Sequence, residues 1–202
     1  MESEKYICVR EQVGDKNEVV IIDLTTKALD RKPISADSAI MHLEENIIAL
    51  KSGTTLQIYN LSTKTKLKAT TMPEDVKFWR WVNTQTLGLI TDRAVFHWSL
   101  EGDSGPVKVF DRHDSLANTQ IINYRANADC TWLILIGISA RDNRVVGTIQ
   151  LYSTERKVCG QGGIGGGRGF YFLFNSHSVR MYFDGKTDVV HTTLLLFHFS
   201  KM

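Results

Sequence analysis

The chain has 202 residues, of which 43% are hydrophobic and 23% are charged, a composition typical of a folded protein with an ordinary buried core. Its 24 basic and 22 acidic residues nearly balance, which argues against a general nucleic-acid-binding protein and leaves only local electrostatic functions. Residues 1–12 carry charges where a secretory signal needs an apolar run, and no apolar stretch approaches the roughly 18 residues of a membrane-spanning helix. Cys8, Cys130 and Cys159 lack metal-like spacing and are predicted to be free thiols in a reducing compartment.

Short apolar runs with strand-like patterns follow one another along the chain, and helical periodicity is scarce. In chain order, the predicted strands are 5–10, 19–23, 47–50, 56–61, 78–82, 87–90, 94–100, 121–125, 132–138 and 146–153. Turn sequences such as GDKN, KSGT and ARDN separate these runs. The pattern predicts an all-β chain built from hairpins.

The strands recur in units that end with an apolar residue followed by a small polar one. These unit ends are Ile22-Asp23, Tyr59-Asn60, Trp98-Ser99 and Tyr152-Ser153. Their spacing is close to the roughly 40 residues of a four-stranded propeller blade. The alternative is a β-sandwich with irregular loops, and the pattern favours the propeller.

A basic stretch follows one of these strands in LQIYNLSTKTKLK, residues 56–68. Period two predicts that Lys64, Lys66 and Lys68 lie on one side of an extended chain. An extended peptide could lie in a groove beside such a strand, with its leucines in apolar pockets and its acidic residues near the lysines. The alternative is a solvated outer strand whose lysines discourage edge pairing.

Six segments carry a resemblance to a known family: MESEKYICVRE, RKPISADSAIM, KFWRW, VFHWSLEGDSGPVKVFDRH, QIINYRA and GTIQLYSTERKV. In this order and spacing, they resemble the N-terminal propeller domain of the clathrin heavy chain over residues 1 to about 158. The resemblance implies a seven-bladed propeller at the foot of each triskelion leg, facing the membrane. A full ring needs roughly 300 residues and the family's domain begins about thirty residues before this segment, so we expect a partial propeller of about four blades.

The remaining residues, 159–202, depart from the family and form a glycine-rich and then apolar tail of unassigned role. Seven of the ten residues from Gly160 to Gly169 are glycine. Residues 160–165 fit the dinucleotide fingerprint G-x-G-x-x-G, which requires a helix after it. The strand-like FYFLF follows instead, so no cofactor site is predicted there. Two regions are therefore expected, 1–158 from the family propeller and 159–202 foreign to it.

The resemblance also implies the residues of a main adaptor site between the first two blades. That site binds clathrin-box peptides, which are short motifs of alternating leucine and acidic residues. The matching positions here are Lys32, Ile48, Thr55, Gln57, Tyr59, Lys64 and Lys66. The family commonly has phenylalanine at the position of Tyr59, arginine at Lys32 and an apolar residue at Asp30.

Two weaker sites follow from the same resemblance. Gln120 and Ile122 match a second peptide pocket towards the centre of the propeller, and Arg156 and Lys157 match part of a third groove. Each pair has an alternative interpretation as ordinary strand residues.

Other kinds of chemistry find less support in the sequence. Phe78, Trp79 and Trp81 suggest a stacking platform for single-stranded nucleic acid, but large aromatics in blade strands more often pack in the core. None of the six histidines forms a metalloprotease or nucleophile motif, and the cluster at 111–114 is interpreted as a polar loop. No catalytic residue, metal or cofactor is predicted.

The expected function is that of a non-enzymatic component of clathrin-coated pits and vesicles. Adaptor proteins that carry clathrin-box peptides are the expected partners, and many weak contacts would gain strength by multivalency. The resemblance also implies clathrin light chains and other heavy chains as partners, through regions absent here, and a cytoplasmic location on the coat face reached through adaptors alone. The alternative is a WD-repeat-like propeller scaffold, although G-H and W-D signatures are lacking.

Overall fold

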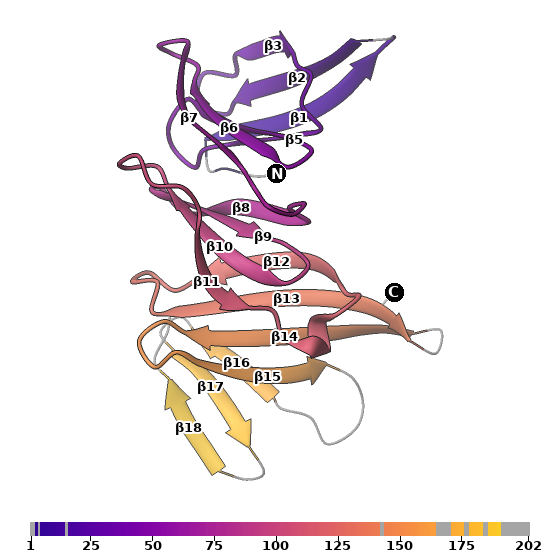
Figure 1. The fold of residues 1–202 in the computed structure, drawn as a ribbon, viewed down its shortest axis with the longest axis vertical. Helices are drawn as coiled ribbons and strands as arrows, with labels where there is room; N and C mark the ends of the chain where they lie inside the picture. Colours follow the sequence, from indigo (N-terminus) through magenta and orange to yellow (C-terminus); the bar gives the residue numbers. More distant parts are fainter. Residues whose placement is uncertain are drawn as a thin grey trace. The chain divides into compact units, whose positions relative to one another are not determined.

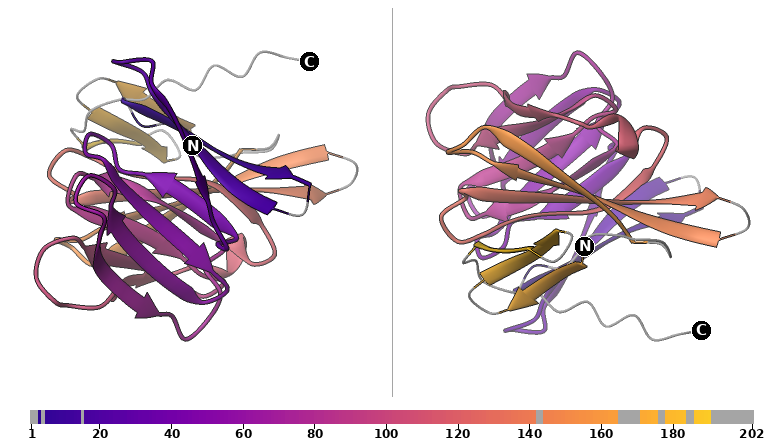
Figure 2. Two further views of the ribbon diagram at one scale, coloured as in Figure 1. Left: turned by 90° about the horizontal axis from the view of Figure 1, so that it is seen from above. Right: turned by 90° about the horizontal axis from the view of Figure 1, so that it is seen from below.

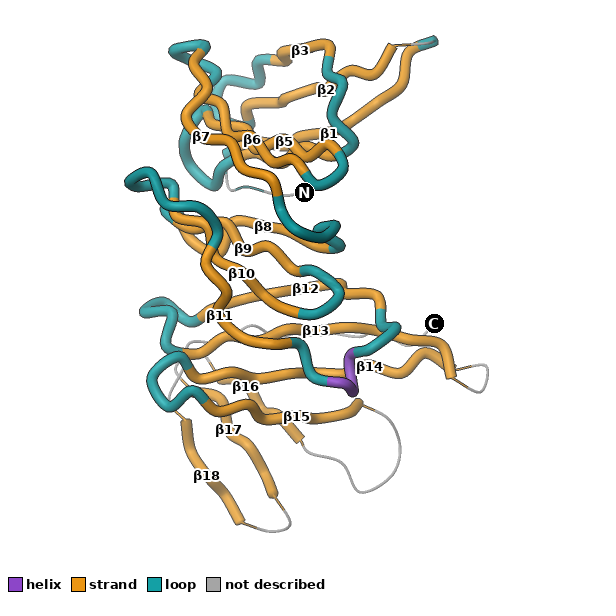
Figure 3. Tube along the Cα trace, viewed as in Figure 1, coloured by secondary structure: helices purple, strands orange, loops and turns teal. Residues whose placement is uncertain are grey.

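The computed structural model describes residues 3, 5–14, 16–141, 144–164, 171–175, 178–183 and 186–190. Over these residues the backbone forms five antiparallel sheets and one short 3₁₀ turn, η1 (Asp114–Leu116), without an α-helix (Figure 3). The all-β prediction is therefore confirmed. The chain divides into two compact units, residues 1–109 and 110–202, and each is described by itself.

The first unit contains two whole sheets and most of a third (Figure 1). The first sheet is β1 (Tyr6–Val13), β2 (Lys16–Asp23) and β3 (Leu29–Pro33). The second sheet is β4 (Ser38–Met41), β5 (Ile47–Ser52), β6 (Thr55–Asn60) and β7 (Thr65–Thr71). The third sheet is β8 (Phe78–Asn83), β9 (Thr86–Ile90), β10 (Ala94–Ser99) and β11 (Val107–Asp111), whose strands pair in chain order.

The second unit contains a four-stranded and a three-stranded sheet. The former is β12 (Gln120–Ala126), β13 (Trp132–Arg141), β14 (Arg144–Ser153) and β15 (Val158–Ile164). The latter is β16 (Tyr171–Asn175), β17 (Ser178–Phe183) and β18 (Lys186–Val190). With 10 residues each, β13 and β14 form a long hairpin that Figure 2 shows in two views.

The glycine-rich segment that the sequence assigns to the tail continues the fourth sheet. Gly160, Gly162 and Gly163 lie in β15, which pairs antiparallel with β14. All five described residues of the fingerprint, 160–164, therefore belong to a sheet ladder, and Gly165 lies outside the described residues. A nucleotide-binding loop of this motif needs the turn between a strand and a helix, whereas these residues lie within a strand.

All ten strands predicted from the sequence occur in the structure, and the predicted unit ends coincide with strand ends. Asp23, Asn60, Ser99 and Ser153 are the last residues of β2, β6, β10 and β14. Eight described strands are not among these ten, namely β3, β4, β7, β11 and β15 to β18. Two of these, β3 and β7, are mostly exposed and polar, so they lack the apolar alternation that marks a half-buried strand.

A five-residue turn explains why the repeat ends on a small polar residue. In residues 23–27 and 60–64, the side-chain oxygen of Asp23 or Asn60 accepts hydrogen bonds from the backbone N–H groups two and three residues later, at 2.8 to 3.1 Å. The Oγ atom of Ser153 accepts one from the N–H three residues later, at 3.2 Å. We call these segments the capped turns, because Asx and Ser side chains replace backbone partners in them.

Each capped turn ends in a lysine with left-handed backbone conformation. The φ angles are 58° at Lys27, 56° at Lys64 and 53° at Lys157. A non-glycine residue costs about 1 kcal/mol in this conformation, so the surrounding hydrogen bonds must hold it there. The turn therefore fixes a lysine at the same point of three sheets.

The second sheet packs against the first and the third through two apolar clusters. Tyr6, Cys8, Val19 and Ile21 of the first sheet meet Met41 and Ile48 of the second. On the other side, Trp79 and Trp81 join Trp98 in a cluster with Leu56 and Ile58, and the exposed fractions of the three tryptophans are 5%, 2% and 1%. Because Trp79 and Trp81 are buried, core packing rather than a nucleic-acid platform accounts for them.

Polar contacts also join the second and third sheets. The His42 imidazole accepts hydrogen bonds at Nδ1 from the backbone N–H groups of Glu44 and Glu45, and its Nε2 lies 2.6 Å from the oxygen of Thr84. This residue is fully buried, and its ring meets Trp81 edge-on at 4.7 Å between centroids. Each ring nitrogen therefore has a backbone partner, as a buried polar group requires.

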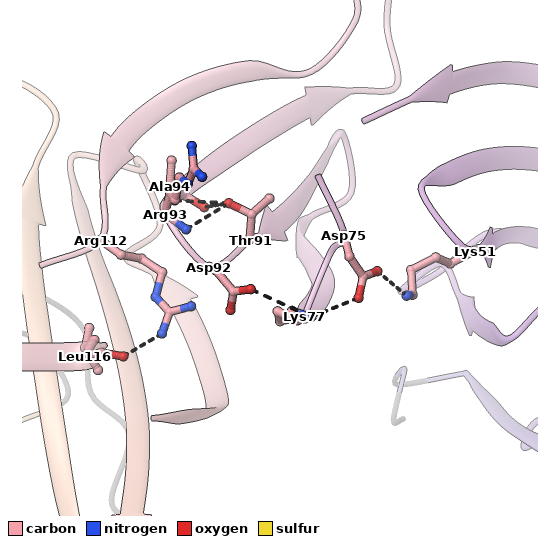
Figure 4. Close-up of polar contacts among 9 residues, drawn as sticks. All are labelled: Lys51, Asp75, Lys77, Thr91, Asp92, Arg93, Ala94, Arg112 and Leu116. Atoms are coloured by element: carbon pink, nitrogen blue, oxygen red, sulfur yellow. Dashed lines mark hydrogen bonds and ion pairs between the residues drawn. The ribbon is translucent and has the colours of Figure 1, made fainter. Parts of the chain in front are cut away.

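A chain of ion pairs runs beside these sheets (Figure 4). The ammonium groups of Lys51 and Lys77 each lie 3.1 Å from one carboxylate oxygen of Asp75, and Lys77 also lies 3.7 Å from Asp92. The hydrogen bonds from Lys51 and Lys77 hold the pKa of Asp75 below its usual range. Because Asp75 lies in the connection between β7 and β8, these pairs tie that connection to both flanking sheets.

Candidate functional site

Two adjoining pockets lie between the first and second sheets of the first unit. One, of about 360 Å³, is lined mainly by apolar side chains and includes Ile34, Ile48 and Leu50; we call it the apolar pocket. The other, of about 480 Å³, includes Ser35 and Ser52, and we call it the polar pocket. Both are lined by β3, the loop after it, β5 and β6, so they form one groove between two sheets.

The pairing register of β5 and β6 determines which side chains form one wall of this groove. Ile48 pairs with Tyr59, Leu50 with Gln57 and Ser52 with Thr55. Directly paired residues of antiparallel strands lie on the same face of the sheet, so these six side chains form one surface. Along that surface the character changes from aliphatic at Ile48 to hydroxyl at Ser52 and Thr55. The two pockets therefore follow from the order of residues in a single hairpin.

Six of the seven residues predicted for the main site line these pockets. The apolar pocket contains Lys32, Ile48, Tyr59 and Lys64, and the polar pocket contains Thr55, Gln57 and again Tyr59. The seventh residue, Lys66, lies on β7 and pairs with Tyr59 of β6. Its side chain is exposed and is not part of the lining of either pocket. The groove thus brings together residues separated by up to 32 positions in the sequence.

Two polar contacts shape the groove. The Tyr59 hydroxyl donates a hydrogen bond to Oε1 of Gln57 at 3.0 Å, and both side chains are partly buried. The ammonium group of Lys32 lies 2.6 Å from Oδ2 of Asp30, and both side chains are exposed. Asp30 thus offsets one of the two positive charges that line the apolar pocket, and the other is the charge of Lys64.

The prediction that Lys64, Lys66 and Lys68 share one side of an extended chain is wrong. Lys64 is the left-handed residue of a capped turn and precedes β7. A β-bulge then interrupts the pairing, because Tyr59 pairs with Lys66 while Ile58 pairs with Lys68. One extra residue on the bulged strand reverses the side on which later residues lie.

Lys68 consequently lies on the face that meets the third sheet. Its ammonium group donates to the backbone oxygens of Ser99 and Ser104, at 2.8 and 3.0 Å, and lies 5.8 Å from the centroid of the Trp98 ring. Lys68 therefore joins two sheets, and only Lys64 and Lys66 remain on the side of the groove.

Apolar members of the groove were missed by the sequence prediction. Val19, Ile34, Leu50 and Leu61 line the apolar pocket but were not among the predicted site residues. Leu50 could have been found, because it follows Ile48 by two residues in one strand and so shares its face. Ile34 lies in the loop after β3, where no periodicity marks its direction.

The two weaker predicted sites lie in the second unit. Gln120 and Ile122 are exposed on β12, beside a bulge between Ile121 and Asn123, and 39% of the Ile122 side chain surface remains accessible. Arg156 and Lys157 are exposed in the capped turn 153–157. These positions present accessible side chains, and their role in binding stays a prediction.

The polar cluster at 111–114 makes structural contacts. The His113 ring caps η1 by accepting a hydrogen bond from the N–H of Ser115 at 3.0 Å, and Arg112 donates to the oxygen of Leu116 at 2.7 Å. Cys8, Cys130 and Cys159 are free thiols. Among the described residues no group of three or more His, Cys, Asp or Glu side chains could hold a metal ion, and no helix there is long and apolar enough to span a membrane.

Comparison with solved structures defines the class of fold. The chain is similar to a structure of the complex of KlAtg21 with the coiled coil of AgAtg16, with a TM-score of 0.59 and 14% identity over 90% of this chain and 61% of that one. It is also similar to the β-propeller domain of Cps50 (Swd1) from Myceliophteria thermophila, with a TM-score of 0.56 and 8% identity over 95% and 67%. Sheets of three or four antiparallel strands with these neighbours define a partial β-propeller.

Sequence relatives identify the family. A family model described as the clathrin propeller repeat matches residues 116–155. The chain is 62% identical to probable clathrin heavy chain 1 of Caenorhabditis elegans, 59% to the clathrin heavy chain of Drosophila melanogaster and 56% to clathrin heavy chain 2 of Homo sapiens, each over 159 residues. Over that 78% of its length, the chain belongs to the clathrin heavy chain family and corresponds to its N-terminal propeller region. It spans about a tenth of the length of these relatives.

Proposed function

We propose that this chain acts as part of a clathrin coat and that the groove between its first two sheets binds short leucine-rich acidic peptides of adaptor proteins. The observation that carries the proposal is that six residues chosen from the family resemblance line two adjoining pockets. The proposed protein is non-enzymatic and acts at the cytoplasmic face of coated pits and vesicles.

The chemistry of the groove suits such a ligand. Aliphatic side chains around Ile48 and Leu50 offer a leucine an apolar environment, and burial of a leucine contributes about 2 kcal/mol. Lys64 at the rim attracts an acidic residue and speeds the encounter. Single contacts of this size give weak binding, so stable association would require several peptides on one adaptor and many chains in one coat.

The test compares two lysines that occupy the same place in two capped turns. In Lys64→Gly the left-handed backbone is retained without strain, because glycine adopts positive φ freely, and only the charge and side chain at the pocket are lost. Lys27→Gly makes the same change in the turn of the first sheet, which lies outside both pockets. Isothermal titration calorimetry with a leucine-rich acidic peptide would measure the dissociation constant for each.

We expect Lys64→Gly to weaken binding about fivefold and Lys27→Gly to change it less than twofold, since a rim charge contributes about 1 kcal/mol. Gln57→Ala should also weaken binding, because its amide lies in the polar pocket. Equal losses in the two glycine variants would show that general charge, and not the groove, attracts the peptide. Failure of the unmodified chain to bind any such peptide would refute the proposal.

A further inference from the structure

Four residues belong to the lining of both pockets, Pro33, Ile34, Leu50 and Tyr59, and Tyr59 alone among these four has a polar side chain. Tyr59 therefore lies where the apolar pocket, which includes Ile48, adjoins the polar pocket, which includes Thr55. At the junction its hydroxyl donates to Oε1 of Gln57 at 3.0 Å. A phenylalanine could form the same apolar wall, but it could not make this hydrogen bond. The hydroxyl therefore has an effect of its own, on the amide of Gln57.

The hydrogen bond determines what Gln57 offers to a ligand. A glutamine amide has one oxygen that accepts and one nitrogen that donates. Because the hydrogen bond from Tyr59 occupies one of the two lone pairs of the oxygen and fixes the amide, the amino group Nε2 offers its two N–H donors to a bound molecule. Ser35, Ser52 and Thr55 add hydroxyl groups to the same pocket. The polar pocket is therefore rich in hydrogen-bond donors.

Among the residues that the structure describes, no charged residue lines the polar pocket. A carboxylate placed there would lose part of its hydration without gaining an opposite charge, which is costly. A neutral acceptor, such as the carboxamide oxygen of asparagine, loses less and can still accept the hydrogen bond from Gln57. Positive charge lies instead at the rim of the apolar pocket, at Lys64.

We propose that Tyr59 is a specificity-determining residue of this groove: by orienting Gln57, it makes the polar pocket select a neutral hydrogen-bond acceptor beside the aliphatic side chain held in the apolar pocket. This inference rests on the proposed function. The inference adds that the preferred peptide has two kinds of polar residue. Its acidic residue lies near Lys64 at the apolar pocket, and an uncharged polar residue lies in the polar pocket near Gln57.

The test uses the whole chain and a series of leucine-rich peptides. Each position that flanks the leucine carries asparagine, aspartate or alanine in turn, and the dissociation constants are measured by calorimetry for the unmodified chain and for Tyr59→Phe. At one position the unmodified chain should prefer asparagine over the other two residues by roughly three- to tenfold, the size of one hydrogen bond. In Tyr59→Phe that preference should fall to less than twofold, while the affinity for the alanine peptide stays within twofold.

Tyr152→Phe is the matched control, because it removes a tyrosine hydroxyl from β14, outside both pockets, and should leave the preference intact. A second measurement follows the side-chain amide of Gln57 by NMR in the free chain, and its resonances should shift in Tyr59→Phe and not in Tyr152→Phe. The inference is overturned if Tyr59→Phe keeps the preference, if its Gln57 resonances do not move, or if the unmodified chain binds all three peptides equally. Binding of none of the peptides would instead refute the proposed function itself.

Discussion

The two faces of the second sheet meet their neighbours in different ways. Towards the third sheet, buried tryptophans fill the space, and Trp79, Trp81 and Trp98 are each at most 5% exposed. Towards the first sheet, aliphatic residues such as Ile48 and Leu50 fill only the base, and pockets of about 360 and 480 Å³ remain above them. The same pairing of sheets thus gives a packed core on one side and a groove on the other.

The comparison shows that side-chain volume decides which interface can receive a ligand. An indole buries much more area than an isoleucine, so three of them leave little room between sheets about 10 Å apart. Polar groups follow the same division. Lys68 on the packed side is held by backbone oxygens of the third sheet, whereas Lys64 on the groove side lines a pocket.

The largest expected effect is on stability at the packed interface. Trp98→Ala removes a side chain that is 1% exposed, together with the hydrogen bond from its indole to the oxygen of Ser104 at 3.2 Å. We expect it to lower the free energy of unfolding by roughly 3–5 kcal/mol, as for other buried aromatics. Urea unfolding followed by circular dichroism measures the change.

The control for Trp98→Ala is Thr55→Ala in the groove, which should cost less than about 1 kcal/mol because Thr55 is only partly buried. Similar losses in the two variants would contradict the division into a packed interface and a groove.

Low pH should reduce the stability of the folded chain through the third sheet and not through the groove. Burial lowers the pKa of His97, on β10, from 6.5 to about 4, and within the described part of the chain no histidine lines either pocket. Between these two values the unfolded chain binds a proton that the folded chain does not, so stability falls as the pH falls. From pH 7 to pH 5 the loss attributable to this group should be about 2 kcal/mol.

Urea unfolding at the two pH values tests this, with His97→Gln as the comparison. The variant lacks the titrating group, so its stability should fall less over the same interval. If both proteins lose the same amount, His97 does not cause the acid sensitivity.

The smallest expected effect concerns the charge of the groove. Asp30→Asn removes the partner of Lys32, which then carries an unpaired charge at the apolar pocket. Because exposed ion pairs contribute little, affinity for a leucine-rich acidic peptide should rise only two- to threefold. The gain should shrink at high salt and be absent for a peptide whose acidic residues are replaced by amides. An equal gain for the amide peptide would show that charge is not the cause.

The sequence alone predicts much of this architecture, because local patterns carry the information. Alternating apolar residues mark β6 and β14, and the polar residues Asp23 and Asn60 mark strand ends because they cap turns. The face shared by Gln57 and Tyr59 follows from period two within one strand.

Other features depend on pairing between strands and were not predictable in this way. The bulge between β6 and β7 separates Lys66 from Lys68, and nothing in LSTKTKLK identifies the extra residue. Outer strands such as β3 have exposed polar sequences that resemble loops. The far wall of the groove contains Ile34, whose position depends on how a loop crosses from one sheet to the next.

The capped turns have a consequence for protein engineering. Lys27 and Lys64 are held in one backbone conformation by equivalent hydrogen bonds, and the segments LTTK and LSTK differ at a single position. Such segments are interchangeable modules, so a turn could be transplanted between blades without redesign of the strands that it joins. Substitution of the lysine in such a turn could then change the ligand preference at that edge of a blade, while the strands of the blade stay the same.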